Sequence, residues 1–101
     1  MDNIHNLTIV IVTYRTDEKI LTECINSLNQ MVKIVVVENS DNKAFKDKFE
    51  KKYSNLNVIL SGKNLGYGAG HNIGLSEVET DYVLIVSPDV IVETNFFPWR
   101  S

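Results

Sequence analysis

Two acidic side chains stand where a carboxylate can reach a ligand. Asp89 follows the apolar run Tyr82–Val86 and the pair Ser87-Pro88, and proline restricts the backbone of that turn. One carboxylate together with substrate phosphates is a suitable ligand set for Mg²⁺ or Mn²⁺. An isolated turn aspartate, however, often has no ligand. Glu38 ends a second apolar run and could accept hydrogen bonds from a base or a ribose, but it equally fits a residue that begins a turn.

A glycine-rich segment lies between them, at residues 64–74, with the sequence NLGYGAGHNIG. It departs from the dinucleotide-binding fingerprint, because His71 stands three residues after Gly68, where that motif requires glycine. It is not a P-loop either, because Gly62-Lys63 lacks the earlier glycine and the following Ser or Thr. Glycines still let the backbone approach a ligand closely, and a following helix would direct free N–H groups at an anion. A mobile loop is the competing interpretation.

Histidine and cysteine offer less. His5 and His71 are too isolated to form a metal-binding pair, and we expect His71 to be a solvated helix residue. Cys24 is the only cysteine, which excludes an intrachain disulfide and a cysteine-rich zinc site and fits a reducing compartment. We predict that Cys24 is a small core residue.

The elements that would position these residues alternate between strands and helices. Short β-branched runs without polar alternation predict strands buried on both faces of a parallel sheet. Apolar side chains at helical spacing predict amphipathic helices, the first of them capped by Thr16 or Asp17. The expected strands are Leu7–Thr13, Lys33–Glu38, Val58–Leu60 and Tyr82–Val86, with a short one at Val90–Val92, and the expected helices span about Ile20–Leu28, Phe45–Tyr53 and Gly70–Glu77.

This order predicts an α/β protein, a Rossmann-like three-layer sandwich with a mainly parallel sheet. In such sheets the ligand lies outside the carboxyl ends of the strands. The residues at those ends are polar or glycine-rich: Thr13-Tyr14-Arg15, Glu38-Asn39-Ser40, residues 64–74 and Ser87-Pro88-Asp89. We therefore expect the functional site at this edge of the sheet.

Length and composition exclude several classes of protein. The 101 residues fit a single domain, and 44% hydrophobic with 23% charged residues is the composition of a folded chain. The net charge of -3 leaves no basic surface for nucleic acid. The start has no basic signal-peptide region, and the longest apolar run, Ile9–Val12, is far too short to span a membrane. We expect a cytoplasmic protein.

Taken together, four ordered motifs closely resemble the family 2 glycosyltransferases of the GT-A fold. They are IVIVTY at residues 9–14, IVVVENS at 34–40, the 64–74 segment, and SPDV at 87–90, so the resemblance extends from about Leu7 to Phe97. It is strongest to the rhamnosyltransferase-like members that assemble surface polysaccharides. The resemblance implies that the nucleotide is contacted by Thr13, Tyr14, Glu38, Asn64, Gly66, Gly68 and Asn72, and that Asp89 holds the Mg²⁺ or Mn²⁺ that bridges the diphosphate.

Three positions depart from the family pattern. Arg15 stands where asparagine is common, Glu38 replaces aspartate, and Ser87 replaces asparagine or aspartate. Ser87 leaves Asp89 as the only carboxylate of the metal motif, which would hold the cation weakly. The family transfers sugar with inversion, which needs a base for the acceptor hydroxyl and positive charge for the departing diphosphate.

The resemblance places that base and the acceptor surface beyond the end of this chain. We therefore expect residues 1–101 to be the N-terminal nucleotide-sugar-binding portion of a truncated enzyme. The donor would be a dTDP- or UDP-linked sugar, and the longer enzyme would reach its glycan acceptor through the missing C-terminal part, at the inner face of the membrane. A non-catalytic nucleotide-binding module is the alternative. A receiver-like signalling domain fits poorly, because Ser61 and Arg15 stand where it needs acids. A truncated sheet should expose apolar surface, so we expect a homo-oligomer that forms through Phe96, Phe97 and Trp99.

Overall fold

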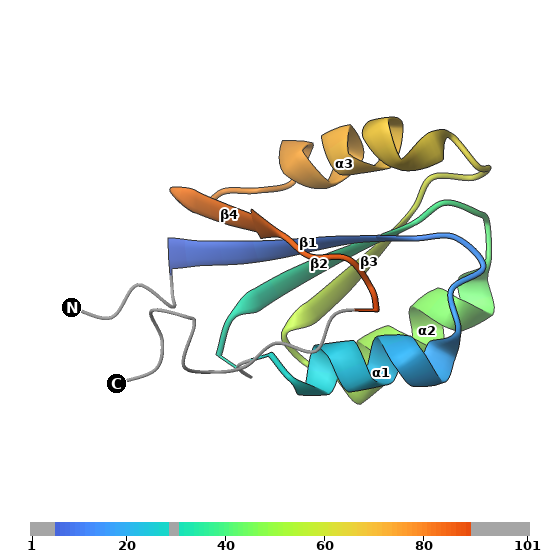
Figure 1. The fold of residues 1–101 in the computed structure, drawn as a ribbon, viewed down its shortest axis with the longest axis horizontal. Helices are drawn as coiled ribbons and strands as arrows, with labels where there is room; N and C mark the ends of the chain where they lie inside the picture. Colours follow the sequence, from blue (N-terminus) through green and yellow to red (C-terminus); the bar gives the residue numbers. More distant parts are fainter. Residues whose placement is uncertain (1–5, 29–30, 90–101) are drawn as a thin grey trace.

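The computed structural model describes residues 6–28 and 31–89, which form a four-stranded parallel sheet with helices on both faces (Figure 1). The expected strand at Val90–Val92 and the residues Phe96, Phe97 and Trp99 lie outside the described part. In chain order the elements are β1 (Leu7–Thr13), α1 (Glu18–Asn26), β2 (Lys33–Glu38), α2 (Lys43–Lys52), β3 (Leu56–Leu60), α3 (Gly66–Ser76) and β4 (Tyr82–Ile85).

The strands lie in the order β3-β2-β1-β4, and every neighbouring pair is parallel. Thr13 pairs with Glu38, and Glu38 with Leu60, so these three strands end level with one another. Figure 1 shows α1 and α2 on one face of the sheet and α3 on the other. The α/β fold class, the parallel sheet and the three layers predicted from the sequence are confirmed.

The two faces of the sheet are packed differently. Alternate residues of β1 and β2, with Ile9 and Ile34 among them, join the buried side chains of α1 and α2 in the larger core cluster. Cys24 belongs to that cluster and is fully buried, as predicted. Ile20 begins the apolar spacing that predicts the first helix, but it lies outside this core and is 42% exposed. The opposite face has a smaller cluster of buried valines, Val10, Val12, Val35 and Val37, beneath α3.

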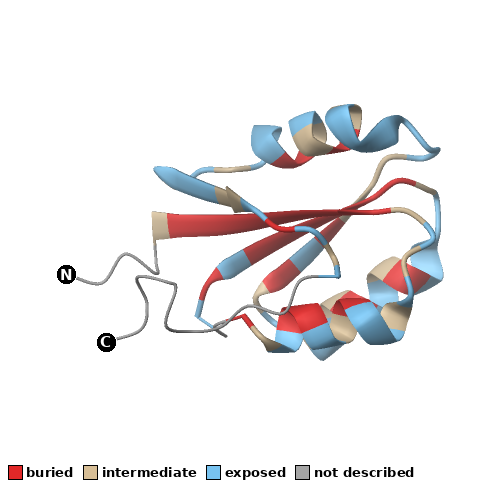
Figure 2. Ribbon diagram, viewed as in Figure 1, coloured by how far each residue is buried: buried red, intermediate tan, exposed pale blue. Residues whose placement is uncertain are grey.

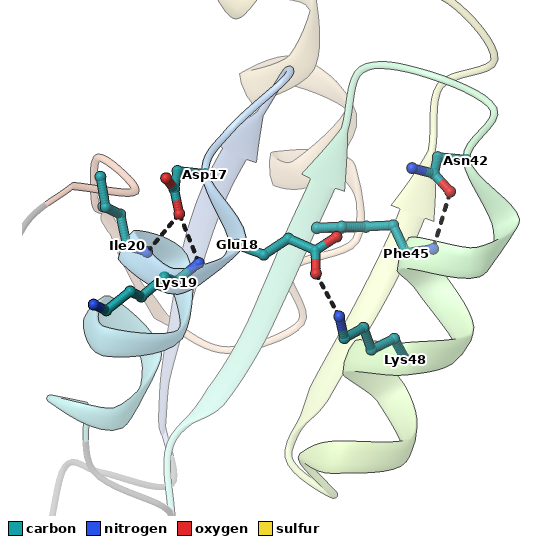
Figure 3. Close-up of polar contacts among 7 residues, drawn as sticks. All are labelled: Asp17, Glu18, Lys19, Ile20, Asn42, Phe45 and Lys48. Atoms are coloured by element: carbon teal, nitrogen blue, oxygen red, sulfur yellow. Dashed lines mark hydrogen bonds and ion pairs between the residues drawn. The ribbon is translucent and has the colours of Figure 1, made fainter.

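Side-chain caps begin the first two helices where the turn residues predict (Figure 3). The Asp17 carboxylate accepts hydrogen bonds from the backbone N–H groups of Lys19 and Ile20, at 2.8 and 3.3 Å. Asn42 accepts from the backbone N–H of Phe45 at 3.0 Å. These bonds satisfy N–H groups that have no partner within a helix. Asp17, rather than Thr16, is therefore the cap of α1.

Helix α3 differs from the prediction, because it begins at Gly66 and not near Gly70. Most of the segment expected as a loop is therefore helical. Two of its glycines face the sheet, where a Cβ on Gly70 would lie 2.7 Å from Val12 Cγ1 and one on Gly74 would lie 2.5 Å from Val10 Cγ1. Such distances are shorter than van der Waals contact. These glycines serve close helix–sheet packing, an interpretation that glycine count alone does not distinguish from a binding loop.

Candidate functional site

Glu38 is held rigidly at the carboxyl edge of the sheet. Its side chain is 6% exposed, one carboxylate oxygen accepts from Thr13 Oγ1 at 2.6 Å, and the other accepts from Ser40 Oγ at 2.5 Å. A carboxylate offers about four acceptor positions. Those left over can accept hydrogen bonds from a ligand with N–H or O–H groups. Thr13 and Glu38, which were both expected at the carboxyl ends of neighbouring strands, are therefore in contact.

Asn39 fixes the start of α3 to the end of β2, a role that the sequence did not reveal. It is buried, its Nδ2 donates to the Gly66 carbonyl at 3.0 Å, and its Oδ1 accepts from the Leu65 N–H at 3.5 Å. Its own backbone N–H donates to the Thr13 carbonyl at 2.8 Å. The sequence indicates this role only by an asparagine directly after a buried strand. An asparagine that simply forms a turn would occupy the same position.

The turn before α3 is shaped by Asn64 and Gly66. Asn64 Oδ1 accepts from the Gly66 N–H at 3.0 Å, and Gly66 has φ +86°, a conformation that favours glycine. The amino end of α3 therefore lies at the same edge of the sheet as Glu38, as the crossover from β3 requires (Figure 1). Helix amino ends attract anions through their free N–H groups and the helix dipole.

A cavity of about 470 Å³ opens between α3 and the turn that follows β4. Tyr67 and His71 form one wall, their ring centroids 6.2 Å apart, and Ser87, Pro88 and Asp89 form another. The volume is within the usual range for small-molecule sites. The sequence analysis did not single out Tyr67 and expected His71 to be a solvated helix residue. Only the packing of α3 on the sheet turns the helix face that carries Tyr67 and His71 toward Asp89.

The other predicted site residues are distributed around this edge. Tyr14 is half-buried, with the Arg15 guanidinium 5.3 Å from its ring centroid. Gly68 and Asn72 are exposed one turn apart on α3. A larger cavity of about 570 Å³, lined by Asn26, Tyr53 and neighbouring residues, lies at the opposite, amino-terminal edge of the strands. Ligand sites of open parallel sheets lie at the carboxyl ends, so the smaller cavity is the candidate site.

A divalent cation would find few protein ligands here. Within residues 6–28 and 31–89, no three His, Cys, Asp or Glu side chains gather as a metal cluster. Asp89 is exposed at the rim of the cavity, with the exposed Ser87 two residues before it. Mg²⁺ commonly binds through one or two carboxylates and completes its shell with substrate phosphates and water. Asp89 fits a site of that kind and does not fit a permanent, all-protein metal site.

The chain is an α/β domain with a parallel sheet, and its candidate ligand site lies at the carboxyl edge of that sheet. The family model of glycosyl transferase family 2 matches residues 8–98. The chain belongs to this family.

Curated relatives and solved structures agree with this assignment. Over 89 residues the chain is 30% identical to the low-salt glycan biosynthesis hexosyltransferase Agl10 of Haloferax volcanii, covering 84% of this chain and 28% of that protein. Over 92 residues it is 30% identical to a teichoic acid poly(glycerol phosphate) polymerase of Staphylococcus epidermidis, covering 83% of this chain and 13% of that protein. The chain thus spans less than a third of either relative.

The fold also matches TarS of S. aureus. The crystal structure of TarS 1–349 superposes with a TM-score of 0.72 and 26% identity, over 90% of this chain and 29% of TarS. The same TarS segment in complex with UDP gives a TM-score of 0.66 over 83% of this chain and 27% of TarS, again with 26% identity. None of the helices in the described part of this chain has the length and apolarity needed to cross a membrane.

Proposed function

We propose that this chain is the portion of a family 2 glycosyltransferase that binds the nucleoside diphosphate of a UDP- or dTDP-linked sugar in the cytoplasm. The observation that carries the proposal is the buried Glu38 carboxylate, fixed by Thr13 and Ser40 beside the amino end of α3. A rigid acceptor suits the N–H of a pyrimidine base or a ribose hydroxyl. The match to TarS, which has been crystallised with UDP, supports this choice of ligand.

The proposed roles divide between the two sides of the site. Thr13, Tyr14 and Glu38 would border the nucleoside. The start of α3 would lie beside the diphosphate, where backbone N–H groups and the helix dipole favour negative charge. That second group comprises Asn64, Gly66, Gly68 and Asn72.

Asp89 would hold Mg²⁺ or Mn²⁺ jointly with the diphosphate. A bound cation supplies the positive charge that stabilises a departing diphosphate. Because Asp89 is the only carboxylate that lines the cavity among residues 6–28 and 31–89, we expect cation and nucleotide to bind together, each strengthening the other. Ser87 offers at most a neutral oxygen.

Transfer with inversion also needs a base for the acceptor hydroxyl. In the part of the chain that the structure describes, the residues that border the cavity include no acid besides Asp89, whose proposed role is to hold the cation. We propose that the base and the acceptor surface belong to a further part of a longer polypeptide that reaches a glycan acceptor at the inner membrane face. The chain alone would then bind the donor without transferring its sugar. A dedicated nucleotide-binding module would behave identically by itself, so only a longer polypeptide with transferase activity separates the two.

The proposal is tested by thermal unfolding of the chain with UDP, dTDP, GDP and CDP, each with and without Mn²⁺. A nucleotide at about 100 times its Kd stabilises by about 2.7 kcal/mol, which raises Tm by roughly 10–20 °C for a domain of this size. We expect the largest shift with UDP or dTDP and Mn²⁺. Equal shifts with all four nucleotides, or none, would contradict the proposal.

A further inference from the structure

The backbone at Arg15 adopts a conformation that arginine does not favour. Within residues 6–28 and 31–89, Arg15 is the only residue other than glycine with a positive φ, at +53°. This left-handed region brings Cβ close to the backbone, so most side chains avoid it, whereas glycine and asparagine adopt it more readily. Strained residues of this kind are concentrated at functional sites. The strain at this position therefore makes the Arg15 side chain a candidate for a functional role.

The guanidinium of Arg15 has no acidic partner in the described part of the chain. It lies against the ring of Tyr14, 5.3 Å from the ring centroid. The carboxylates that follow it in sequence are engaged elsewhere. Asp17 caps α1 by accepting from backbone N–H groups, and Glu18 pairs with Lys48 at 2.6 Å. Because Arg15 is also exposed, its N–H donors are available to a ligand.

Arg15 lies at the carboxyl edge of the sheet, in the turn that leads from β1 to α1. Figure 2 shows the chain passing here from the buried strand β1 into a more exposed turn. Thr13 pairs with Glu38 across β1 and β2, and Arg15 follows Thr13 by two residues. Neighbouring strands are about 4.8 Å apart. A ligand bound to the Glu38 carboxylate is therefore within reach of a side chain as long as that of arginine.

The topology separates Arg15 from the side of the site that is proposed for the diphosphate. That side consists of the amino end of α3 and Asp89. The turn of Arg15 leads to α1, which covers the opposite face of the sheet from α3 (Figure 1). Arg15 therefore belongs with Tyr14 and Glu38, on the side proposed for the nucleoside. A guanidinium can only donate hydrogen bonds, and an ionised carboxylate can only accept them.

We propose that Arg15 is a specificity-determining residue that donates a hydrogen bond to a carbonyl oxygen of the nucleobase, so that uracil or thymine is bound in preference to cytosine. The inference rests on the proposed function. Uracil and thymine present a ring N–H beside a carbonyl oxygen, which suits an acceptor, Glu38, beside a donor, Arg15. Cytosine has a bare ring nitrogen in place of that N–H and an amino group in place of that carbonyl. Donor would then face donor and acceptor would face acceptor, which lowers affinity.

The test compares the Kd values of UDP, dTDP and CDP by calorimetry in the presence of Mn²⁺. In Arg15→Asn the ratio of the CDP Kd to the UDP Kd should fall by about tenfold, the contribution of one hydrogen bond from a charged donor. The contribution of Glu38 is common to both proteins and cancels in this comparison. We expect dTDP to follow UDP, because thymine has the same carbonyl groups. Arg15→Gly should behave like Arg15→Asn, and in neither variant should the ligand-free Tm fall, because both residues tolerate a positive φ.

Lys19→Asn is the matched control, because it removes one exposed positive charge from the first turn of α1 and should leave the Kd ratio unchanged. If the parent binds none of the three nucleotides, the proposed function is wrong, and the role of Arg15 with it. If the parent binds UDP and both Arg15 variants keep its Kd ratio, only the role of Arg15 is wrong. Equal weakening of UDP and CDP would assign Arg15 to the diphosphate and overturn the proposal. A lower Tm in both variants, or a changed ratio in Lys19→Asn, would overturn it as well.

Discussion

Replacing Gly74 by alanine should destabilise the protein, although alanine is the better helix former. The new Cβ would lie 2.5 Å from Val10 Cγ1 and 3.2 Å from Val37 Cγ2. Ordinary carbon contacts are about 3.5–4.0 Å, so α3 would have to move away from the sheet by about 1 Å. Both valines are fully buried and stiff at χ1, and they cannot rotate away cheaply.

Gly68 provides the matched control on the same helix, because a Cβ there meets nothing within 4 Å. Alanine gains about 1 kcal/mol of helix propensity at either position. Overpacking a core costs about 1–3 kcal/mol, and only Gly74→Ala incurs that cost. Since the propensity gain cancels between the two variants, their difference isolates the packing. We expect Gly68→Ala to be more stable than Gly74→Ala by about 1–3 kcal/mol.

Urea unfolding followed by circular dichroism measures this difference directly. It corresponds to a Tm difference on the order of 10 °C for a domain of this size. The slope of the unfolding transition should be unchanged, because both variants expose the same surface on unfolding. If both substitutions stabilise the chain equally, α3 does not seat against β1 through Gly74, and the assignment of this glycine to packing is wrong.

Four further predictions concern the site and the β3 edge. Asp89→Asn should abolish the Mn²⁺-dependent part of the thermal shift with UDP and leave the ligand-free Tm unchanged, since Asp89 is exposed. Glu38→Gln should weaken UDP binding, measured by calorimetry, by about tenfold, which corresponds to about 1.4 kcal/mol. The metal dependence of binding should not change. If the variant binds UDP as tightly as the parent, Glu38 has only a structural role. Glu50 Oε2 accepts hydrogen bonds from Lys46 and from the Val58 N–H on β3, which hold the pKa of Glu50 below its usual value of 4.5. The stability that Glu50 contributes should be complete at neutral pH and lost as pH falls below 4.5 through its lowered folded pKa. Urea titrations of the parent and Glu50→Gln should therefore converge in acid. Residues 1–101 should form no glycoside from labelled donors, because the loss of a general base alone lowers the rate by about 10²- to 10⁴-fold. Robust transfer would refute the proposal that the base and the acceptor surface lie in a further part of a longer polypeptide.

The buried strands and capped helices could be predicted from local sequence. The apolar runs around Ile9 and Val35 do not alternate with polar residues, because both faces of β1 and β2 are covered by helices. Asp17 indicates the start of a helix, because its side chain accepts a hydrogen bond from a backbone N–H two residues further along the chain. The position of Glu38 at the carboxyl edge of the sheet followed from its place at the end of an apolar run. Each of these features depends on residues that are close in the chain.

The start of α3 could not be predicted in that way. Its cap Leu65 makes no side-chain capping bond, and the helix is anchored by Asn39, 27 residues before Gly66. Likewise, Gly70 and Gly74 are indistinguishable in sequence from glycines that approach a ligand. Their packing role exists only because Val10 and Val12 lie directly beneath them.

The sequence by itself therefore determined the order of the elements, the layers of the sandwich and the polar strand ends, because hydrophobic pattern and turn chemistry act over a few residues. The tertiary structure decided where α3 begins, which of its faces meets Asp89 across the cavity, and which side chains bond the outward backbone groups of β3. Val58 illustrates the difference: the β-branched pattern marks it as a strand residue, but only the packing of α2 brings Lys46 and Glu50 to its outward backbone groups. Contacts of this kind join segments that no local pattern relates.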